Sequence, residues 1–186
     1  MDESSRAKMV RSAASLMASR GVTATSFSEV VADSGAPRGS IYHHFPAGKQ
    51  QLAEEAVDWT SSRVLAYLRA IPPESGVQVL DAFIALWRQV VESSRGSSGC
   101  AVAGAALDTP DGEGGLLGVV RATFRSWVAA LAERLQAAGV AAERAEPIAL
   151  AALAAMEGAL ILCRAEGGAA PLDTVAQELR LLLREA

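Results

Sequence analysis

The sequence has little of what disulfide-rich, metal-binding or β-rich proteins need. Its 186 residues include two cysteines, two histidines and 5% aromatic residues. Cys100 and Cys163 do not make a disulfide framework, and in a reducing cytosol both are expected as free thiols. The scarcity of aromatic residues argues against an all-β protein, because strands favour aromatic and β-branched residues in alternation.

Long uncharged segments are also absent. The longest one covers residues 96–107, which is 12 residues, whereas a transmembrane helix needs about 20. Residues 1–6 are polar and lack the apolar segment of a secretory signal. With 51% apolar residues, the composition also argues against disorder. We therefore expect a soluble, cytoplasmic protein with no membrane partner.

The charge is unevenly distributed along the chain. The net charge is −4, yet residues 1–50 hold six cationic and four acidic residues, and residues 51–186 hold eleven and seventeen. An acidic total argues against a protein that coats nucleic acid indiscriminately. It is compatible with a small, locally basic, DNA-facing part on an acidic body.

Glycine and proline divide the chain into segments whose apolar spacing is helical nearly everywhere. The pattern predicts an all-α fold of about nine helices, with a boundary between an N-terminal domain (1–48) and a C-terminal bundle (49–186). The expected helices cover 4–20, 26–34, 38–45, 49–70, 75–94, 116–138, 143–165 and 172–184, with one short turn near 102–107 inside a loop at 95–115.

Residues 26–45 predict a helix-turn-helix. Ser26 and Glu29 form a capping box at the start of the first short helix, Gly35 permits the turn, and Pro37 suits the first position of the second helix. Ile41 and Phe45 are four residues apart and would pack inward. The residues left on other faces donate hydrogen bonds or are small, as a helix in the major groove requires.

The motifs of this segment resemble the N-terminal domain of the tetracycline-repressor (TetR/AcrR) family over residues 5–57. They are Gly21, Thr25-Ser26-Phe27, Val30, Ser34-Gly35, Gly39-Ser40-Ile41-Tyr42, His44-Phe45, Lys49 and Leu52. Two details depart from the common pattern: Pro37 stands where a serine often caps the recognition helix, and one extra residue separates Phe45 from Lys49. Pro37-Arg38-Gly39-Ser40, with Gly48 before the lysine, is similar to a subgroup associated with multidrug and antibiotic-resistance regulators.

The resemblance implies a dimeric transcription factor, usually a repressor, that binds a near-palindromic double-stranded operator. It implies a C-terminal domain that dimerises and encloses a small-molecule effector, with no cofactor and no enzyme activity. Scarce polar residues among the C-terminal helices suggest a largely apolar effector. The DNA-contacting residues expected from chemistry and resemblance are Thr25, Ser26, Ser28, Arg38, Gly39, Ser40, Tyr42, His43, His44 and Lys49.

Two further sets of site residues are predicted in the C-terminal helices, one for the effector and one for the dimer interface. Aromatic residues that could line an effector site, or simply form core, are Trp59, Tyr67, Phe83, Trp87, Phe124 and Trp127. Residues 143–165 and 172–184 are expected at the dimer interface, although both helices could instead be buried within one chain. The interface candidates are Ala152, Ala155, Ala159, Leu179, Leu182 and Leu183.

Three alternatives remain at this point. A metal site at His43 and His44 is disfavoured, because adjacent helical residues point about 100° apart and metal ligands on a helix prefer a spacing of four. A helical enzyme has only a weak signal, at Cys100, Asp108 and Asp111 in the 95–115 loop. A DNA-binding protein without an effector is the third alternative, and the size of the apolar bundle argues against it.

Overall fold

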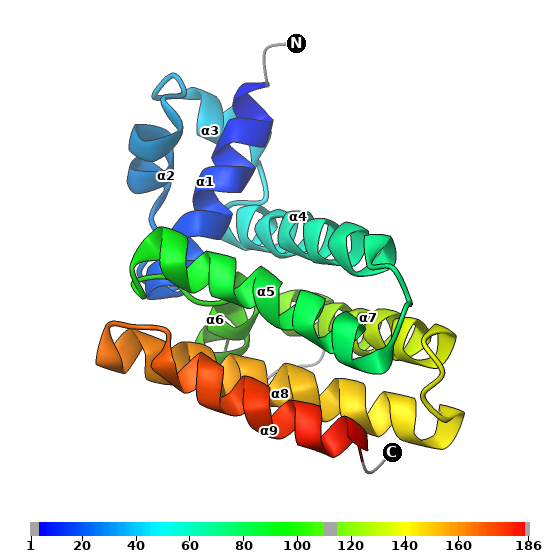
Figure 1. The fold of residues 1–186 in the computed structure, drawn as a ribbon. Helices are drawn as coiled ribbons and strands as arrows, with labels where there is room; N and C mark the ends of the chain where they lie inside the picture. Colours follow the sequence, from blue (N-terminus) through cyan, green and yellow to red (C-terminus); the bar gives the residue numbers. More distant parts are fainter. Residues whose placement is uncertain (1–3, 110–114, 185–186) are drawn as a thin grey trace. The chain divides into compact units, whose positions relative to one another are not determined.

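The computed structural model describes residues 4–109 and 115–184, and within these ranges every regular element is an α-helix (Figure 1). The prediction of an all-α fold is confirmed. The described residues form nine helices: α1 (Ser5–Arg20), α2 (Phe27–Ser34), α3 (Ser40–His44), α4 (Lys49–Ala70), α5 (Gly76–Ser94), α6 (Ala101–Asp108), α7 (Gly115–Ala137), α8 (Ala142–Glu166) and α9 (Ala170–Arg184).

Contacts within the chain divide it into two compact units. The first comprises residues 1–62 and 100–123, and the second comprises residues 63–99 and 124–186. The long helices α4 and α7 therefore contribute to both units, and α6 belongs with the N-terminal helices. The domain boundary predicted at residue 48 stays a prediction.

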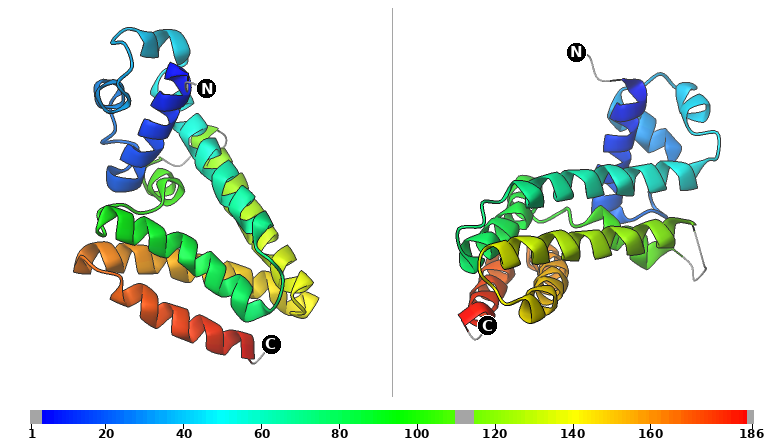
Figure 2. Two further views of the ribbon diagram at one scale, coloured as in Figure 1. Left: turned by 45° about the horizontal axis from the view of Figure 1, so that its top comes forward. Right: turned by 90° about the vertical axis from the view of Figure 1, so that its right-hand side faces the viewer.

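In the first unit, α1 is the central helix and packs against α2, α3 and α6 (Figure 2). Met9, Ala13 and Met17 lie at helical spacing on α1 and are buried. They pack in a core that includes Val30 of α2 and Ile41 of α3. The helices expected at 26–34 and 38–45 therefore pack against the one expected at 4–20, and α6 packs against it as well.

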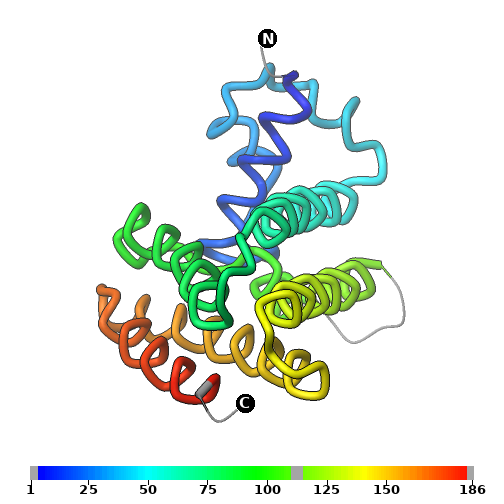
Figure 3. Tube along the Cα trace, turned by 45° about the vertical axis from the view of Figure 1, so that its right-hand side comes forward, coloured from blue at the N-terminus to red at the C-terminus, as the bar shows by residue number. Residues whose placement is uncertain are grey.

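In the second unit, α5 packs against α8 and α9, and α8 packs against α9 (Figure 3). Two ion pairs join α5 to α9: Arg88 with Asp173, and Arg180 Nε with Asp81 Oδ1 at 2.7 Å. Two of the described helices, α7 and α8, are apolar and long enough to cross a membrane by length and composition alone. Contacts of α8 with α5 and α9 bury one side of this helix, and Leu150, Ile161 and Leu162 on it are exposed.

The structure differs from the sequence prediction at two short helices. The second motif helix begins at Ser40 and not at Arg38, where the predicted range began, because residues 37–39 form a turn in which Ser40 N donates to Pro37 O at 3.0 Å. The segment expected as loop with one helical turn contains the two-turn helix α6. Its N-cap is Cys100, whose Sγ accepts from Ala103 N at 3.5 Å. Cysteine is not a preferred capping residue, so this start carried no sequence signal.

Candidate nucleic-acid interface

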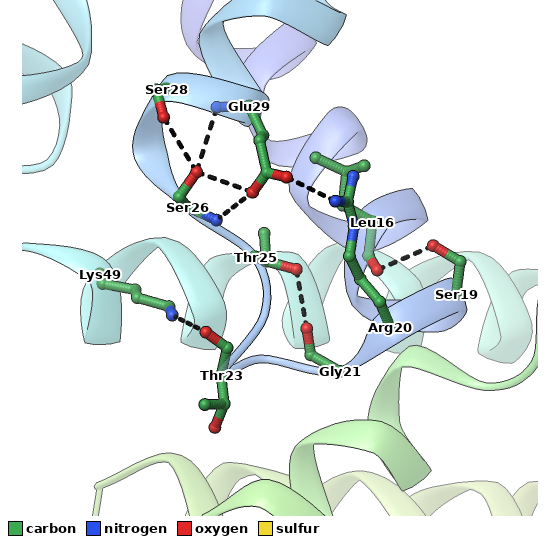
Figure 4. Close-up of polar contacts among 10 residues, drawn as sticks. All are labelled: Leu16, Ser19, Arg20, Gly21, Thr23, Thr25, Ser26, Ser28, Glu29 and Lys49. Atoms are coloured by element: carbon green, nitrogen blue, oxygen red, sulfur yellow. Dashed lines mark hydrogen bonds and ion pairs between the residues drawn. The ribbon is translucent and has the colours of Figure 1, made fainter.

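The N-terminus of α2 is fixed by the capping box read from the sequence (Figure 4). Ser26 Oγ accepts from Glu29 N at 3.3 Å, and Ser26 N donates to Glu29 Oε2 at 2.9 Å. Arg20 at the end of α1 pairs with the same carboxylate. Hydrogen bonds from Ser26, together with the nearby Arg20, hold the pKa of Glu29 below its ordinary value. The start of the helix-turn-helix is thereby tied to α1.

The turn between α2 and α3 depends on a glycine, as predicted. Gly35 ends α2 in the left-handed conformation with a φ of 65°, which other residues resist. Behind α2, Ser12 Oγ donates to Asp33 Oδ2 at 2.6 Å and so links α1 to the end of α2. These contacts set the direction in which the chain enters α3.

Helix α3 is anchored on one side and open on the other. Ile41 and Phe45 are 2% and 1% exposed, so they form its anchor. Tyr42 is 70% exposed, and its ring lies edge-on to Phe27 of α2 with centroids 5.6 Å apart. The remaining predicted α3 residues lie at or near the surface: Arg38, Gly39 and His43 are exposed, and Ser40 and His44 are half-buried.

The other predicted DNA contacts lie around the turn between α1 and α2. Ser26 and Ser28 are exposed and their hydroxyls lie 3.0 Å apart. Thr25 is buried, and its hydroxyl donates to Gly21 O at 2.7 Å, so this side chain shapes the turn. Lys49 is exposed, and its Nζ donates to Thr23 O at 2.9 Å. That these residues contact DNA stays a prediction. The inward placement of Thr25 does not favour a DNA contact by its side chain.

Comparison with known proteins identifies this arrangement. Residues 10–56 match the family model of bacterial regulatory proteins of the tetR family, and residues 76–178 match the C-terminal domain of LmrA/YxaF-like transcriptional regulators. The chain belongs to the TetR family. The resemblance read from the motifs is confirmed, and the TetR helix-turn-helix comprises α2 and α3.

Full-length relatives agree with this assignment. An HTH-type transcriptional regulator of Mycobacterium tuberculosis is 38% identical over 96% of this chain and 93% of its own length. The HTH-type transcriptional regulator YxaF of Bacillus subtilis is 31% identical over 97% and 96%. Among solved structures, a TetR regulator from Legionella pneumophila has the same fold, with a TM-score of 0.86, 21% identity and 98% coverage of both chains.

The predicted effector residues are divided between the two units. Trp59 lies in the first unit and is half-buried. In the second unit, Tyr67 donates its hydroxyl to Ala82 O at 2.8 Å, which joins α4 to α5. The other four form one aromatic cluster, with centroid distances of 5.7 to 6.2 Å between successive rings: Phe83, Trp87, Trp127 and Phe124.

The predicted interface residues are only partly accessible. Ala152, Ala159 and Leu179 are buried by the chain's own packing, and Ala155, Leu182 and Leu183 are half-buried. Apolar residues that the sequence analysis did not select are exposed instead, among them Leu150, Ile161 and Leu162 on α8. The opposite faces of an apolar helix cannot be told apart by composition alone, so the sequence carried little signal for this choice.

The structure also places two of the three loop residues that gave the weak signal for a helical enzyme. Cys100 is buried as the N-cap of α6, and Asp108 lies at the end of the same helix. Asp108 Oδ2 accepts a hydrogen bond from Thr23 N at 3.0 Å. Asp111 lies outside the described residues. Sequence reasoning missed the contact between α6 and the α1–α2 turn because no local pattern encodes a contact between residues 85 positions apart.

Proposed function

We propose that this chain is a ligand-responsive repressor that binds a near-palindromic operator as a homodimer in the cytoplasm. The observation that carries the proposal is the exposed face of α3, held from behind by Ile41 and Phe45. Such a helix can enter the major groove without losing its own packing. The family consists of transcriptional regulators, which supports a role without catalysis.

The exposed residues divide by chemistry into two kinds of DNA contact. Tyr42, His43 and Ser40 can donate to or accept from base edges, and Arg38 can reach a phosphate or a guanine. Ser26 and Ser28, beside the N-terminus of α2, suit a phosphate oxygen, because backbone N–H groups and the helix dipole favour an anion there. Lys49 would add a cation near the same turn.

Dimerisation follows from an unpartnered stripe on α8. Its members repeat at spacings of three and four, so they lie on one face, and small residues in its middle allow a second helix to approach closely. The stripe is exposed in the single chain and comprises Leu150, Ala151, Ala154, Gly158, Ile161 and Leu162. We propose this face, with the exposed Leu181 of α9, as the interface between two copies.

Release by an effector follows from the geometry of a dimer on DNA. Two recognition helices must lie about 34–36 Å apart to meet successive major grooves. A ligand that binds in the C-terminal helices and changes this separation by a few ångströms would weaken the complex. We propose that the effector is small and largely apolar, and that the aromatic cluster of α5 and α7 forms part of its site.

The test is a fluorescence-anisotropy titration against DNA that flanks the protein's own gene, with scrambled DNA as competitor. The wild type should bind at two protomers or a multiple of two per site and resist the competitor. Arg38→Ala and Tyr42→Ala should each weaken binding by about tenfold or more. Arg69→Ala is the matched control, since it removes the same charge from an exposed position of α4 in the second unit.

Two outcomes would contradict the proposal. Equal losses for Arg38→Ala and Arg69→Ala would show a non-specific charge effect and not recognition by α3. A selection from randomised DNA that yields no preferred sequence would exclude operator binding altogether. Circular dichroism of each variant separates loss of recognition from loss of fold.

A further inference from the structure

A pair of aromatic rings joins the two helices of the helix-turn-helix at its surface. Phe27 is the first residue of α2 and is half-buried, and Tyr42 on α3 is 70% exposed. Their ring centroids lie 5.6 Å apart at an interplanar angle of 70°, which is the edge-to-face arrangement that aromatic rings favour. The proposed function uses Tyr42 as a DNA contact and gives Phe27 no role.

The contact with Phe27 restricts the side chain of Tyr42. Helix α3 comprises five residues, and its N-cap is a glycine, Gly39, which supplies no capping side chain. Ile41 and Phe45 are buried and fix the helix itself. An exposed tyrosine on the open side of such a helix changes between rotamers unless a neighbour prevents it. The ring of Phe27 is such a neighbour, because a change in the χ1 angle of Tyr42 would break the edge-to-face contact.

This restriction favours binding if it exists before DNA arrives. A side chain that becomes immobile only on association lowers the affinity, because its rotamer freedom is lost at that moment. An edge-to-face contact that is already formed in the free protein can raise the affinity by about threefold to tenfold. Phe27 also lies between Ser26 and Ser28, the proposed phosphate contacts, so the same ring links the start of α2 to the tyrosine of α3.

We infer that Phe27 is a positioning residue for operator recognition, whose ring holds Tyr42 in the orientation in which its hydroxyl meets the major groove. The inference rests on the proposed function and adds a residue that acts on DNA through Tyr42. Leucine at position 27 would keep an apolar side chain but offer no ring, so Phe27→Leu should lower operator affinity by about threefold to tenfold. Phe27→Tyr keeps the ring and should retain the wild-type affinity.

Fluorine NMR observes the surroundings of the Tyr42 ring without DNA. The chain contains two tyrosines, Tyr42 and Tyr67, so protein labelled with 3-fluorotyrosine gives two signals, which Tyr42→Phe assigns. In Phe27→Leu, the Tyr42 signal should move toward that of free 3-fluorotyrosine, because the ring current of Phe27 is gone. The Tyr67 signal is the internal control and should not move, since its hydroxyl donates to Ala82 O in the second unit.

A double-mutant cycle separates positioning from a structural role and from a direct DNA contact of Phe27. The DNA is the sequence that the wild type prefers in a selection from randomised DNA, and fluorescence anisotropy measures the affinity. Phe27→Leu should weaken binding in the wild type but change nothing further in Tyr42→Ala, because the group that it positions is already absent. Leu16→Ala is the matched control, since it shortens another half-buried apolar side chain of the first unit and should leave the affinity unchanged.

Four results would overturn the inference while the proposed function stands. They are an unmoved Tyr42 signal in Phe27→Leu, an unchanged operator affinity of that variant, an equal loss in the Tyr42→Ala background, and an equal loss for Leu16→Ala. If the selection yields no preferred sequence, the proposed function fails and the inference fails with it. A cooperative thermal transition shows that each variant is folded, and Phe27→Met takes the place of Phe27→Leu if the leucine variant lacks one.

Discussion

The carboxylate of Asp108 accepts a hydrogen bond from the backbone N–H of Thr23, with 3.0 Å between Oδ2 and N. The carbonyl oxygen of Thr23 accepts a hydrogen bond from Lys49 Nζ at 2.9 Å. Thr23 lies in the turn that connects α1 to the helix-turn-helix, so this turn is held by α6 through one group and by α4 through the other. Gly21 opens the turn with a φ of 82°, a conformation that favours glycine.

The first prediction concerns the Asp108 acceptor. Asp108→Ala should remove the partner of the Thr23 N–H and lower the free energy of unfolding by about 1 kcal/mol, the usual worth of such a bond. Asp108→Asn is the matched control, because its amide oxygen can still accept. Hydrogen exchange at the Thr23 amide is the direct measurement. It should accelerate in the alanine variant and stay slow in the asparagine variant; equal exchange in both would refute a structural role for this bond.

The second prediction concerns the approach of α6 to α1. A Cβ at Gly104 would lie 3.0 Å from the carbonyl oxygen of Met17 and 3.6 Å from Gly21 Cα, so the backbone of one helix would have to shift. At Gly118 of α7, a Cβ would meet nothing within 4 Å. Gly118→Ala should therefore raise the free energy of unfolding by about 0.5–1 kcal/mol, the usual gain in a helix interior.

Gly104→Ala should instead lower the free energy of unfolding, so the two variants differ in sign. Chemical denaturation of both proteins checks this difference. The close approach would be shown to be unimportant if Gly104→Ala gained as much stability as Gly118→Ala.

These two contacts show where prediction from the sequence reached its limit. The capping box at Ser26 and the left-handed Gly35 are local features, so their residues alone predicted them correctly. Ile41 and Phe45 followed from helical spacing. The contact of Asp108 with Thr23 depends on tertiary packing, and its helix was hidden because a cysteine caps it in a glycine- and serine-rich segment.

The exposed side of α8 was unpredictable for a related physical reason. The helix is apolar almost all round, so periodicity could not tell the face packed in the chain from the face left open. The structure places Ala152 and Ala159 in the core and leaves Ile161 and Leu162 exposed. Whether a buried indole N–H finds a hydrogen-bond partner likewise depends on side-chain placement and not on residue type, and those of Trp87 and Trp127 find none among the described residues.

The third prediction is a pH dependence from Glu29. Its pKa is lowered from the ordinary value of 4.5, chiefly by hydrogen bonds from Ser26. A carboxyl group with a lowered pKa in the folded state stabilises the protein above its unfolded-state pKa, and this contribution is lost as the pH falls through the folded-state value. The wild type should therefore be more stable than Glu29→Gln at pH 7, and the difference should shrink as the pH falls below 4.5.

Thermal unfolding at a series of pH values measures this difference. Arg20→Ala should keep most of the pH dependence, because the ion pair is a smaller cause of the shift than the bonds from Ser26. Ser26→Ala should lose a larger part of it, because the hydroxyl is the largest cause of the shift, although the N–H of residue 26 can still donate to Glu29. A pH dependence that follows Arg20 and not Ser26 would show that the charge pair, and not the capping box, sets the pKa of Glu29.

The fourth prediction tests the open face of α8. Leu162→Glu would place a charge on a side chain that is 51% exposed in the single chain and belongs to the proposed interface. Burying a charge in an apolar interface is strongly destabilising, so the dimer should dissociate. Leu107→Glu is the matched control, since Leu107 is 80% exposed but lies on α6 of the first unit.

Light scattering coupled to size-exclusion chromatography distinguishes the two variants. The wild type and Leu107→Glu should have the mass of a dimer, and Leu162→Glu that of a monomer with an unchanged helical spectrum. A monomer has one helix-turn-helix and so contacts only one half-site of the operator. It should therefore also lose most of its operator affinity, although the exposed face of α3 with Tyr42 is unchanged. A dimeric Leu162→Glu protein would place the interface elsewhere, and a monomeric Leu107→Glu protein would move it to α6.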